Sequence, residues 1–222
     1  MILKNKFFLL IFFFVVFTTY NFNEPKKNFS IIFPIKEIII EKTNAVNLIK
    51  LKSELEFLRK TSLFFLKEKE ILKVTDKHDF ILNIQLKKKY PNTLKIFISE
   101  KIPVASEIDG NNRYYLTKDG KKINYIELKI YEDLPVIFGN HKNFSSFFSD
   151  IEKSNFKIKN IKAFYYFDIG RWDIVLKDER IIKLPDTNYE NILKEIDLIL
   201  NDSNFSKYKI FDHRIKDQLI LE

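Results

Sequence analysis

The chain has 222 residues, no cysteine and four glycines, and its 38 lysines and arginines outnumber its 30 aspartates and glutamates. The missing cysteine excludes disulfides and thiol catalysis, and so few glycines disfavour a phosphate-binding loop. A net charge of +8 can attract nucleic acid or anionic lipid. We instead attribute the lysines to a compositional bias toward AT-rich codons, which places them on solvated surfaces, and predict no nucleic-acid partner.

An apolar block near the N-terminus, Phe7–Phe17, follows Lys4 and Lys6. A spanning helix needs about 20 residues, and extending this block over 2–20 nearly reaches that length. A cleaved signal peptide fits the apolar length equally well, but no small-residue cleavage pattern follows the block. We predict an uncleaved anchor with a cytoplasmic N-terminus. The predicted segments are a short cytoplasmic tail (1–6), a transmembrane anchor (7–20) and a polar linker (21–30).

The next 75 or so residues predict a small α+β domain over 31–104. An isoleucine-rich strand spans Ile35–Glu41, and Asn44 or Asn47 can cap a helix. Leucines recur on one face of that helix at positions 48, 51, 55 and 58. A second helix is predicted over Lys67–Lys77. A hairpin follows, with strands Phe80–Leu86 and Leu94–Ser99 around a proline-containing turn. Two helices would then cover one face of a three-stranded sheet.

The second half, 105–222, predicts a mostly antiparallel β domain with flanking helices. The helices are Asn143–Ser154 and about Tyr189–Leu200. In the latter we expect Ile192, Leu193, Ile196, Leu198 and Ile199 to be buried. Trp172, the only tryptophan, is assigned to the core. The predicted strands are Ala105–Ile108, Arg113–Thr117, Ile158–Phe167, Trp172–Leu176, Ile181–Leu184, Tyr208–Phe211 and Gln218–Leu221.

No constellation of residues indicates catalysis. The three histidines, at positions 78, 141 and 213, are far apart and lack zinc-ligand spacing. No nucleophile elbow or glycine-rich phosphate loop is present. Acidic pairs such as Glu132-Asp133 are adjacent in predicted turns and therefore point apart. We predict that the chain is not an enzyme and needs no cofactor, metal or small-molecule substrate.

Three stretches of sequence resemble the FtsQ family of cell-division proteins, called DivIB in some bacteria. One is the turn and strand Tyr90–Ile96 followed by Ser99-Glu100-Lys101-Ile102-Pro103-Val104-Ala105, which is similar to the family's "E-R-x-P-V-A" junction. The others are Leu134–Gly139 ("L-P-x-[IL]-x-G") and Arg171–Leu176 with Ile182–Leu184 ("R-W-x-L-x-L…I-x-L"). Asp212-His213-Arg214 resembles the "D-L-R" that opens the last strand. Departures are Lys42-Thr43-Asn44 where the family usually has a glycine, Lys101 in place of arginine, and His213 in place of an apolar residue.

The resemblance implies a single-pass inner-membrane protein with a POTRA domain and a β domain in the periplasm, concentrated at the division septum. It implies a scaffold that binds the coiled coil of FtsB-like and FtsL-like membrane proteins, contacts other divisome components, and links septal peptidoglycan synthesis to the division ring. The alternative is a POTRA-containing periplasmic binding or secretion-accessory protein outside cell division. A secreted binding protein released by signal peptidase is another.

The last strand, Gln218–Glu222, ends at the final residue and is therefore expected at a sheet edge, where a partner strand can dock. Leu219 and Leu221 should share one face, with Ile220 on the other. By position, the resemblance implies contact with the FtsB-like partner through Arg214, Ile215, Asp217, Gln218, Leu219 and Ile220. The alternative is that these are ordinary sheet residues without a partner.

Overall fold

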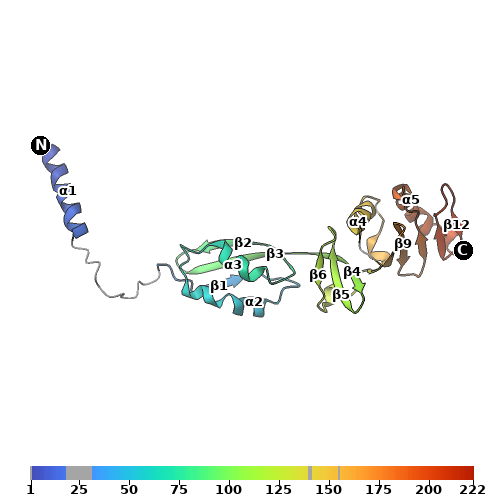
Figure 1. Ribbon diagram of the computed structural model, residues 1–222, viewed down its shortest axis with the longest axis horizontal. Coiled ribbons are helices and arrows are strands. Elements are labelled where there is room, and N and C mark those ends of the chain that lie inside the picture. Colours follow the sequence, from blue (N-terminus) through green and yellow to red (C-terminus); the bar gives the residue numbers. More distant parts are fainter. Residues whose placement is uncertain (1, 19–31, 140–141, 155) are drawn as a thin grey trace.

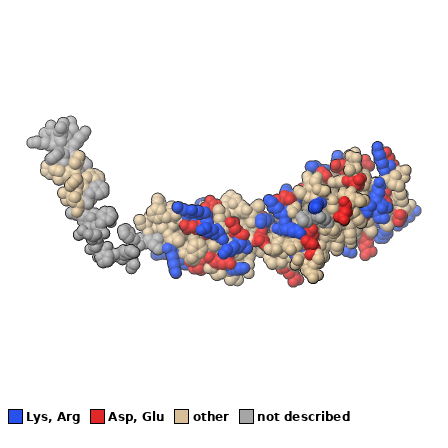
Figure 2. Space-filling view, in the orientation of Figure 1, with Lys and Arg blue, Asp and Glu red and all other residues tan. Residues whose placement is uncertain are grey.

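The computed structural model describes residues 2–18, 32–139, 142–154 and 156–222. After the N-terminal helix come a three-stranded sheet and a nine-stranded sheet, which follow one another along the long axis of the molecule (Figure 1). The last strand lies at the far end of the larger sheet. Basic and acidic side chains are interspersed over both sheets on the face shown in Figure 2, as expected for solvated lysines.

Helix α1, Ile2–Thr18, contains the predicted apolar block. Its described apolar side chains, Phe8, Leu10 and residues 11–16, are all exposed. Within the residues that the structure describes, no helix combines the length and the apolar character needed to cross a membrane. The last two residues of the predicted anchor and the whole predicted linker, 21–30, lie outside the described residues.

The region that forms the three-stranded sheet has the predicted order of elements. In chain order these are β1 (Glu37–Ile40), α2 (Leu48–Glu54), the 3₁₀ helix η1 (Glu56–Lys60), α3 (Glu68–Thr75), β2 (Ile81–Lys89) and β3 (Thr93–Glu100). The strand order is β1-β3-β2, with β1 parallel and β2 antiparallel to β3. The two predicted helices and three predicted strands are therefore confirmed.

Helix α2 begins as its sequence predicts. The Asn47 side chain accepts a hydrogen bond from the Lys50 N–H at 3.0 Å, which caps the first turn. Leu51, Leu55 and Leu58 are fully buried, whereas Leu48 is only half-buried. The α-helix ends at Glu54 and the chain continues as η1, so the leucine stripe runs on through a change of helix type.

The loop before α2 wraps around a carboxylate from the end of β3. Glu100 accepts hydrogen bonds from the backbone N–H groups of Asn44, Ala45 and Val46 at 2.9, 2.8 and 2.8 Å. This loop overlaps the Lys42-Thr43-Asn44 segment, where the resembled family usually has a glycine. The carboxylate therefore holds the loop in place with charge-assisted bonds.

The large sheet contains nine strands in the order β12-β11-β10-β9-β8-β7-β4-β5-β6. Most neighbouring pairs are antiparallel, as predicted, while β7 is parallel to β4 and β8, and β10 is parallel to β11. Strands β6 and β7 are not among the strands predicted by range. The strand bounds are β4 Pro103–Asp109, β5 Asn112–Thr117, β6 Lys122–Asn124, β7 Val136–Phe138, β8 Ile161–Phe167, β9 Arg171–Leu176, β10 Ile181–Lys183, β11 Ile210–Asp212 and β12 Ile220–Leu221.

Helices α4 (Phe144–Lys153) and α5 (Glu190–Asn201) share one core with this sheet. Trp172 is buried there and stacks on Phe147, with ring centroids 4.6 Å apart, which confirms its core assignment. In α5, Leu193 and Ile196 are buried as predicted, whereas Ile192 and Ile199 are only half-buried. The prediction that Leu198 is buried is wrong, because its side chain is 74% exposed. Short 3₁₀ helices complete the fold: η2 (Lys129–Tyr131), η3 (Ile158–Asn160) and η4 (Ser203–Phe205).

The two sheets meet through aromatic side chains near β5 and β6. Tyr115 of β5 lies 5.9 Å from Phe80 and 5.5 Å from Tyr131 between ring centroids. Its hydroxyl donates to the Ile126 carbonyl at 2.9 Å. Tyr115 and Ile123 are buried in the same cluster as the core of the three-stranded sheet. The β6 end of the large sheet is thus covered.

Candidate partner-binding edge

Strand β12 forms the other end of the large sheet and has a neighbour only on its β11 side. It pairs antiparallel to β11, with Phe211 opposite Leu221 and Asp212 opposite Ile220. Next in this register, Ile210 and Glu222 exchange hydrogen bonds at 3.0 and 3.2 Å. The strand therefore lies at an edge, as the sequence predicted.

The register decides which backbone groups of β12 remain open. Hydrogen-bonded and non-hydrogen-bonded pairs alternate along an antiparallel ladder. Because Ile210 and Glu222 form a bonded pair, Asp212 and Ile220 form the next one. Leu221 then directs its N–H and C=O away from β11, toward the open edge.

The two faces of β12 differ as predicted. Leu219 and Leu221 pack against the core under α5, whereas Ile220 is 40% exposed on the opposite face. The strand is shorter than predicted, because only Ile220 and Leu221 are in β conformation. A turn in which the Gln218 N–H donates to the Ile215 carbonyl, with Asp217 at φ 58°, keeps the preceding residues out of the ladder.

A groove of about 700 Å³ lies between α5, the loop before α5, and the β11–β12 connection. Five of the six predicted contact residues line it: Arg214, Ile215, Asp217, Gln218 and Leu219. Ile220, the sixth, is not among its lining residues. Sequence reasoning missed the opposite wall, which contains Ile192, Glu195 and Ile199 of α5. The spacing of the two isoleucines along one flank of the helix was the available signal.

A buried carboxylate positions the arginine at the entrance to β12. The Arg214 guanidinium donates from Nε to both oxygens of Asp212 at 2.9 Å, and the Lys183 ammonium lies 4.0 Å from the same carboxylate. These hydrogen bonds from Arg214 lower the pKa of Asp212 despite its burial. The Asp212 side chain is 4% exposed and that of Arg214 45%, so the arginine keeps much of its surface available.

The charges continue across the sheet from this pair. Asp173 of β9 lies opposite Lys183, and its carboxylate is 3.2 Å from the Arg171 Nε without hydrogen-bond geometry. Burial raises the pKa of Asp173, and the positive charge of Arg171 opposes that shift. Alternating charges thus extend over β9, β10 and β11 up to the edge strand.

His213 occupies the position where the resembled family has an apolar residue. Its backbone N–H donates to the Lys183 carbonyl at 2.9 Å, while its Nε2 is buried without a hydrogen-bond partner. Desolvation lowers the pKa of His213, although Asp212 and Glu195 act against that shift. A neutral imidazole therefore fills this part of the groove wall.

Comparisons with known proteins agree with this architecture. The family described as "POTRA domain, FtsQ-type" matches residues 33–101, and "Cell division protein FtsQ/DivIB, C-terminal" matches residues 107–214. Together the two matches cover most of the chain. The chain belongs to the FtsQ/DivIB cell-division family. Five of the six predicted contact residues lie beyond the end of the second match.

Individual members of the FtsQ/DivIB family are similar over much of their length. The cell division protein FtsQ of Rickettsia typhi is 25% identical over 194 residues, covering 86% of this chain and 73% of its own. That of Rickettsia prowazekii is 27% identical over 195 residues, covering 86% and 72%. FtsQ of Blochmanniella floridana is 26% identical over 126 residues, covering 49% and 43%.

No group of three potential metal ligands occurs among the described residues. The family is a scaffold family of cell division, and the predicted absence of catalysis and cofactors stays a prediction.

Proposed function

We propose that this FtsQ/DivIB-family chain is a divisome scaffold that binds the C-terminal segment of an FtsB-like protein along β12. The observation that supports it is the open edge beside the 700 Å³ groove, at the end of the sheet remote from β6. The partner segment would add a further strand and place side chains in the groove. An FtsL-like protein would be held through its coiled coil with the FtsB-like chain.

Because β12 is short, backbone hydrogen bonds to the strand and side-chain contacts in the groove should contribute unequally to binding. Each added backbone hydrogen bond contributes about 1 kcal/mol net, and a two-residue strand offers few. Side chains seated in the groove, against Ile192, Ile199 and Leu219, would therefore supply most of the affinity. Arg214, held by Asp212, is placed to pair with a carboxylate of the partner.

We propose further that α1 anchors the chain in the inner membrane. Its 17 residues rise about 25 Å, somewhat less than a hydrocarbon core of about 30 Å. Local thinning and snorkelling of flanking lysines can accommodate that difference. The exposed apolar side chains of α1 support contact with lipid. The N-terminus would then be cytoplasmic and both sheets periplasmic, with the protein concentrated at the septum.

In this role the scaffold would connect septal peptidoglycan synthesis to the division ring through its partners, including other divisome components. The cell-division family gives no reason to prefer the alternative of a secretion-accessory protein. The proposed boundaries remain those predicted: tail 1–6, anchor 7–20, linker 21–30, POTRA domain 31–104 and β domain 105–222.

A capture experiment from membranes tests the edge. The intact chain, a chain cut before Arg214, and the full-length Ile220→Arg variant are each used to capture FtsB-like and FtsL-like proteins. Ile108→Arg is the matched control, since Ile108 is 44% exposed on the same sheet. We expect capture by the intact chain and the control, loss of capture by the cut chain, and weaker capture by Ile220→Arg, since Ile220 lies on the edge strand but outside the groove lining. Equal capture by all four chains would contradict the role of β12, and no capture by the intact chain would contradict the scaffold assignment.

A further inference from the structure

The smaller sheet also ends in an open strand. In the order β1-β3-β2, β1 has a neighbour on one side only. The Glu37 and Glu41 N–H groups donate to the Asn92 and Ile96 carbonyls, at 3.2 and 3.0 Å. These bonds fix the phase of the parallel ladder, in which alternate residues face the neighbour. Ile38 and Ile40 therefore direct their backbone N–H and C=O groups to the open side.

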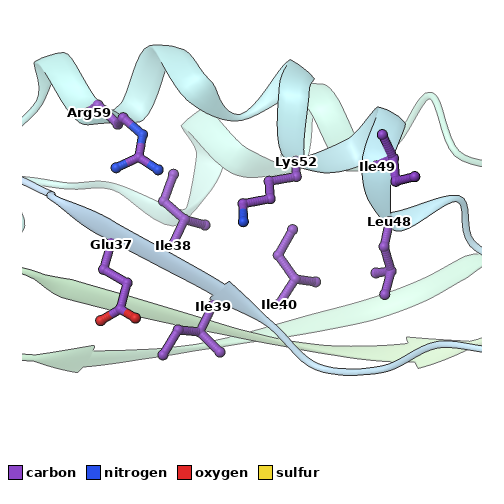
Figure 3. A pocket seen from close by; sticks show the side chains of 8 residues that line it. All are labelled: Glu37, Ile38, Ile39, Ile40, Leu48, Ile49, Lys52 and Arg59. Carbon is purple, nitrogen blue, oxygen red and sulfur yellow. The ribbon is translucent and has the colours of Figure 1, made fainter.

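A groove of about 430 Å³ runs along this open side, between β1 and the helical segment above it. In Figure 3, Ile38 and Ile40 point toward the helices, whereas Glu37 and Ile39 point to the other face of the sheet. Leu48 and Ile49 complete the apolar part of the lining, and Ile49 is 85% exposed. The open backbone groups and an apolar floor are thus side by side.

Two cations project over the groove from the helical side (Figure 3). Arg59 is already engaged, since it donates to the Lys36 carbonyl and pairs with Glu56. It closes the edge at the Lys36 end and leaves the part at Ile38 and Ile40 open. The Lys52 side chain makes no ion pair or hydrogen bond with any described residue. Its ammonium is therefore the uncompensated charge above the apolar floor.

We propose that this groove binds an extended segment of another polypeptide, which adds to β1 as a fourth strand and carries apolar side chains and one carboxylate on its groove-facing side. The open groups of Ile38 and Ile40 would pair with its backbone. The carboxylate would meet Lys52, which no carboxylate of the described chain neutralises. Because β1 and β12 lie in different sheets, the chain can bind this segment and the segment at β12 at the same time.

The charge requirement is tested with a fluorescein-labelled probe peptide, Thr-Val-Thr-Glu-Thr-Val-Thr with capped ends, and its Glu-to-Lys counterpart. Anisotropy is measured with the full chain in detergent solution. The Lys52→Glu variant should bind the acidic probe with an affinity about tenfold or more lower than the parent chain does. It should bind the lysine probe with a higher affinity than the parent chain does. Lys50→Glu, the same change on the same helix outside the groove, should alter affinity by less than about threefold, because salt screens distant charges.

Backbone pairing is tested by N-methylating the probe on alternate residues, in two complementary sets. Only one set of amides faces β1. Methylation of that set should abolish binding, whereas methylation of the other set should leave the affinity unchanged. Binding by both methylated probes, or an acidic probe indifferent to Lys52→Glu, would overturn the proposal. So would sedimentation showing that the chain alone dimerises through this edge and loses the dimer in Lys52→Glu, since the occupant would then be a second copy.

Discussion

The two ends of the nine-stranded sheet differ in burial: the β6 end is covered and the β12 end is open. At the β6 end, Tyr115 and Ile123 are buried in the core of the neighbouring sheet. At the β12 end, Ile220 is 40% exposed and one side of a two-residue strand is unpaired. The covered end is buried among large aromatic side chains, whereas the two residues of β12 at the open end are aliphatic. The difference indicates that one end holds the molecule together and the other is available to a partner.

The covered end should carry the larger share of stability. Tyr115→Ala removes a buried ring and its hydrogen bond to the Ile126 carbonyl, and should lower the free energy of unfolding by about 3–5 kcal/mol. The control is Tyr165→Ala, whose ring is 39% exposed, with an expected change of about 1 kcal/mol or less. Denaturant unfolding of the two variants measures the contrast. Equal losses would mean that the junction is not a true core.

Close to the junction, Glu100 should contribute the next largest effect. Glu100→Gln replaces a carboxylate that accepts three backbone hydrogen bonds, and should reduce stability by about 2–3 kcal/mol. Glu127→Gln, on an exposed loop, should change it by less than about 0.5 kcal/mol. Thermal unfolding monitored by circular dichroism compares them. A loss no greater in Glu100→Gln than in the control would show that the loop needs no carboxylate.

At the open end, Asp212 should make the free energy of unfolding depend on pH in the acidic range. Arg214 lowers the pKa of Asp212 below its ordinary value of 3.8, so its contribution is present above that value and is lost as pH falls through the lower folded pKa. Asp173 acts in the opposite direction, because burial raises its pKa and its contribution is lost as pH rises through that value. Asp212→Asn should therefore cost more stability at pH 7 than near pH 2. A uniform loss at both pH values would contradict this.

Ile220→Ala should have the smallest effect on folding, within about 0.5 kcal/mol, because its side chain is exposed. The same variant should still weaken capture of the FtsB-like protein. Isothermal unfolding and capture, measured on one preparation, separate the two readouts. A large loss of stability would place Ile220 in the core rather than on a binding surface.

Local patterns predicted most of the elements but not all of their limits. Asn47 as cap and the leucines of α2 were readable because helix caps and apolar periodicity are local. The buried stripe of α5 is Leu193, Ile196 and Leu200, and Leu198 falls on the far side of the helix from it. The missed strand β7 pairs in parallel with two strands distant in sequence. Its three residues are also fewer than the run of four or more by which a strand is recognised in sequence.

In the candidate site too, local features were predictable from the sequence, whereas features that depend on folding were not. The split of the two faces of β12 was predictable from the alternation of side chains, and the predicted edge position agrees with the strand order. The length of the strand was not, because a turn with Asp217 in the left-handed region ends the pairing. The α5 wall of the groove was also missed, since only folding brings Ile192 and Ile199 beside residues 213–219.

Hydrogen–deuterium exchange at the Leu221 amide tests the central claim most directly. In the free chain this N–H faces the open edge, whereas the Glu222 N–H is bonded to the Ile210 carbonyl at 3.2 Å. On adding the C-terminal segment of the FtsB-like protein, exchange at Leu221 should slow by about tenfold or more, with a smaller change at Glu222. Unchanged exchange at Leu221 while the segment is bound would contradict strand addition at β12.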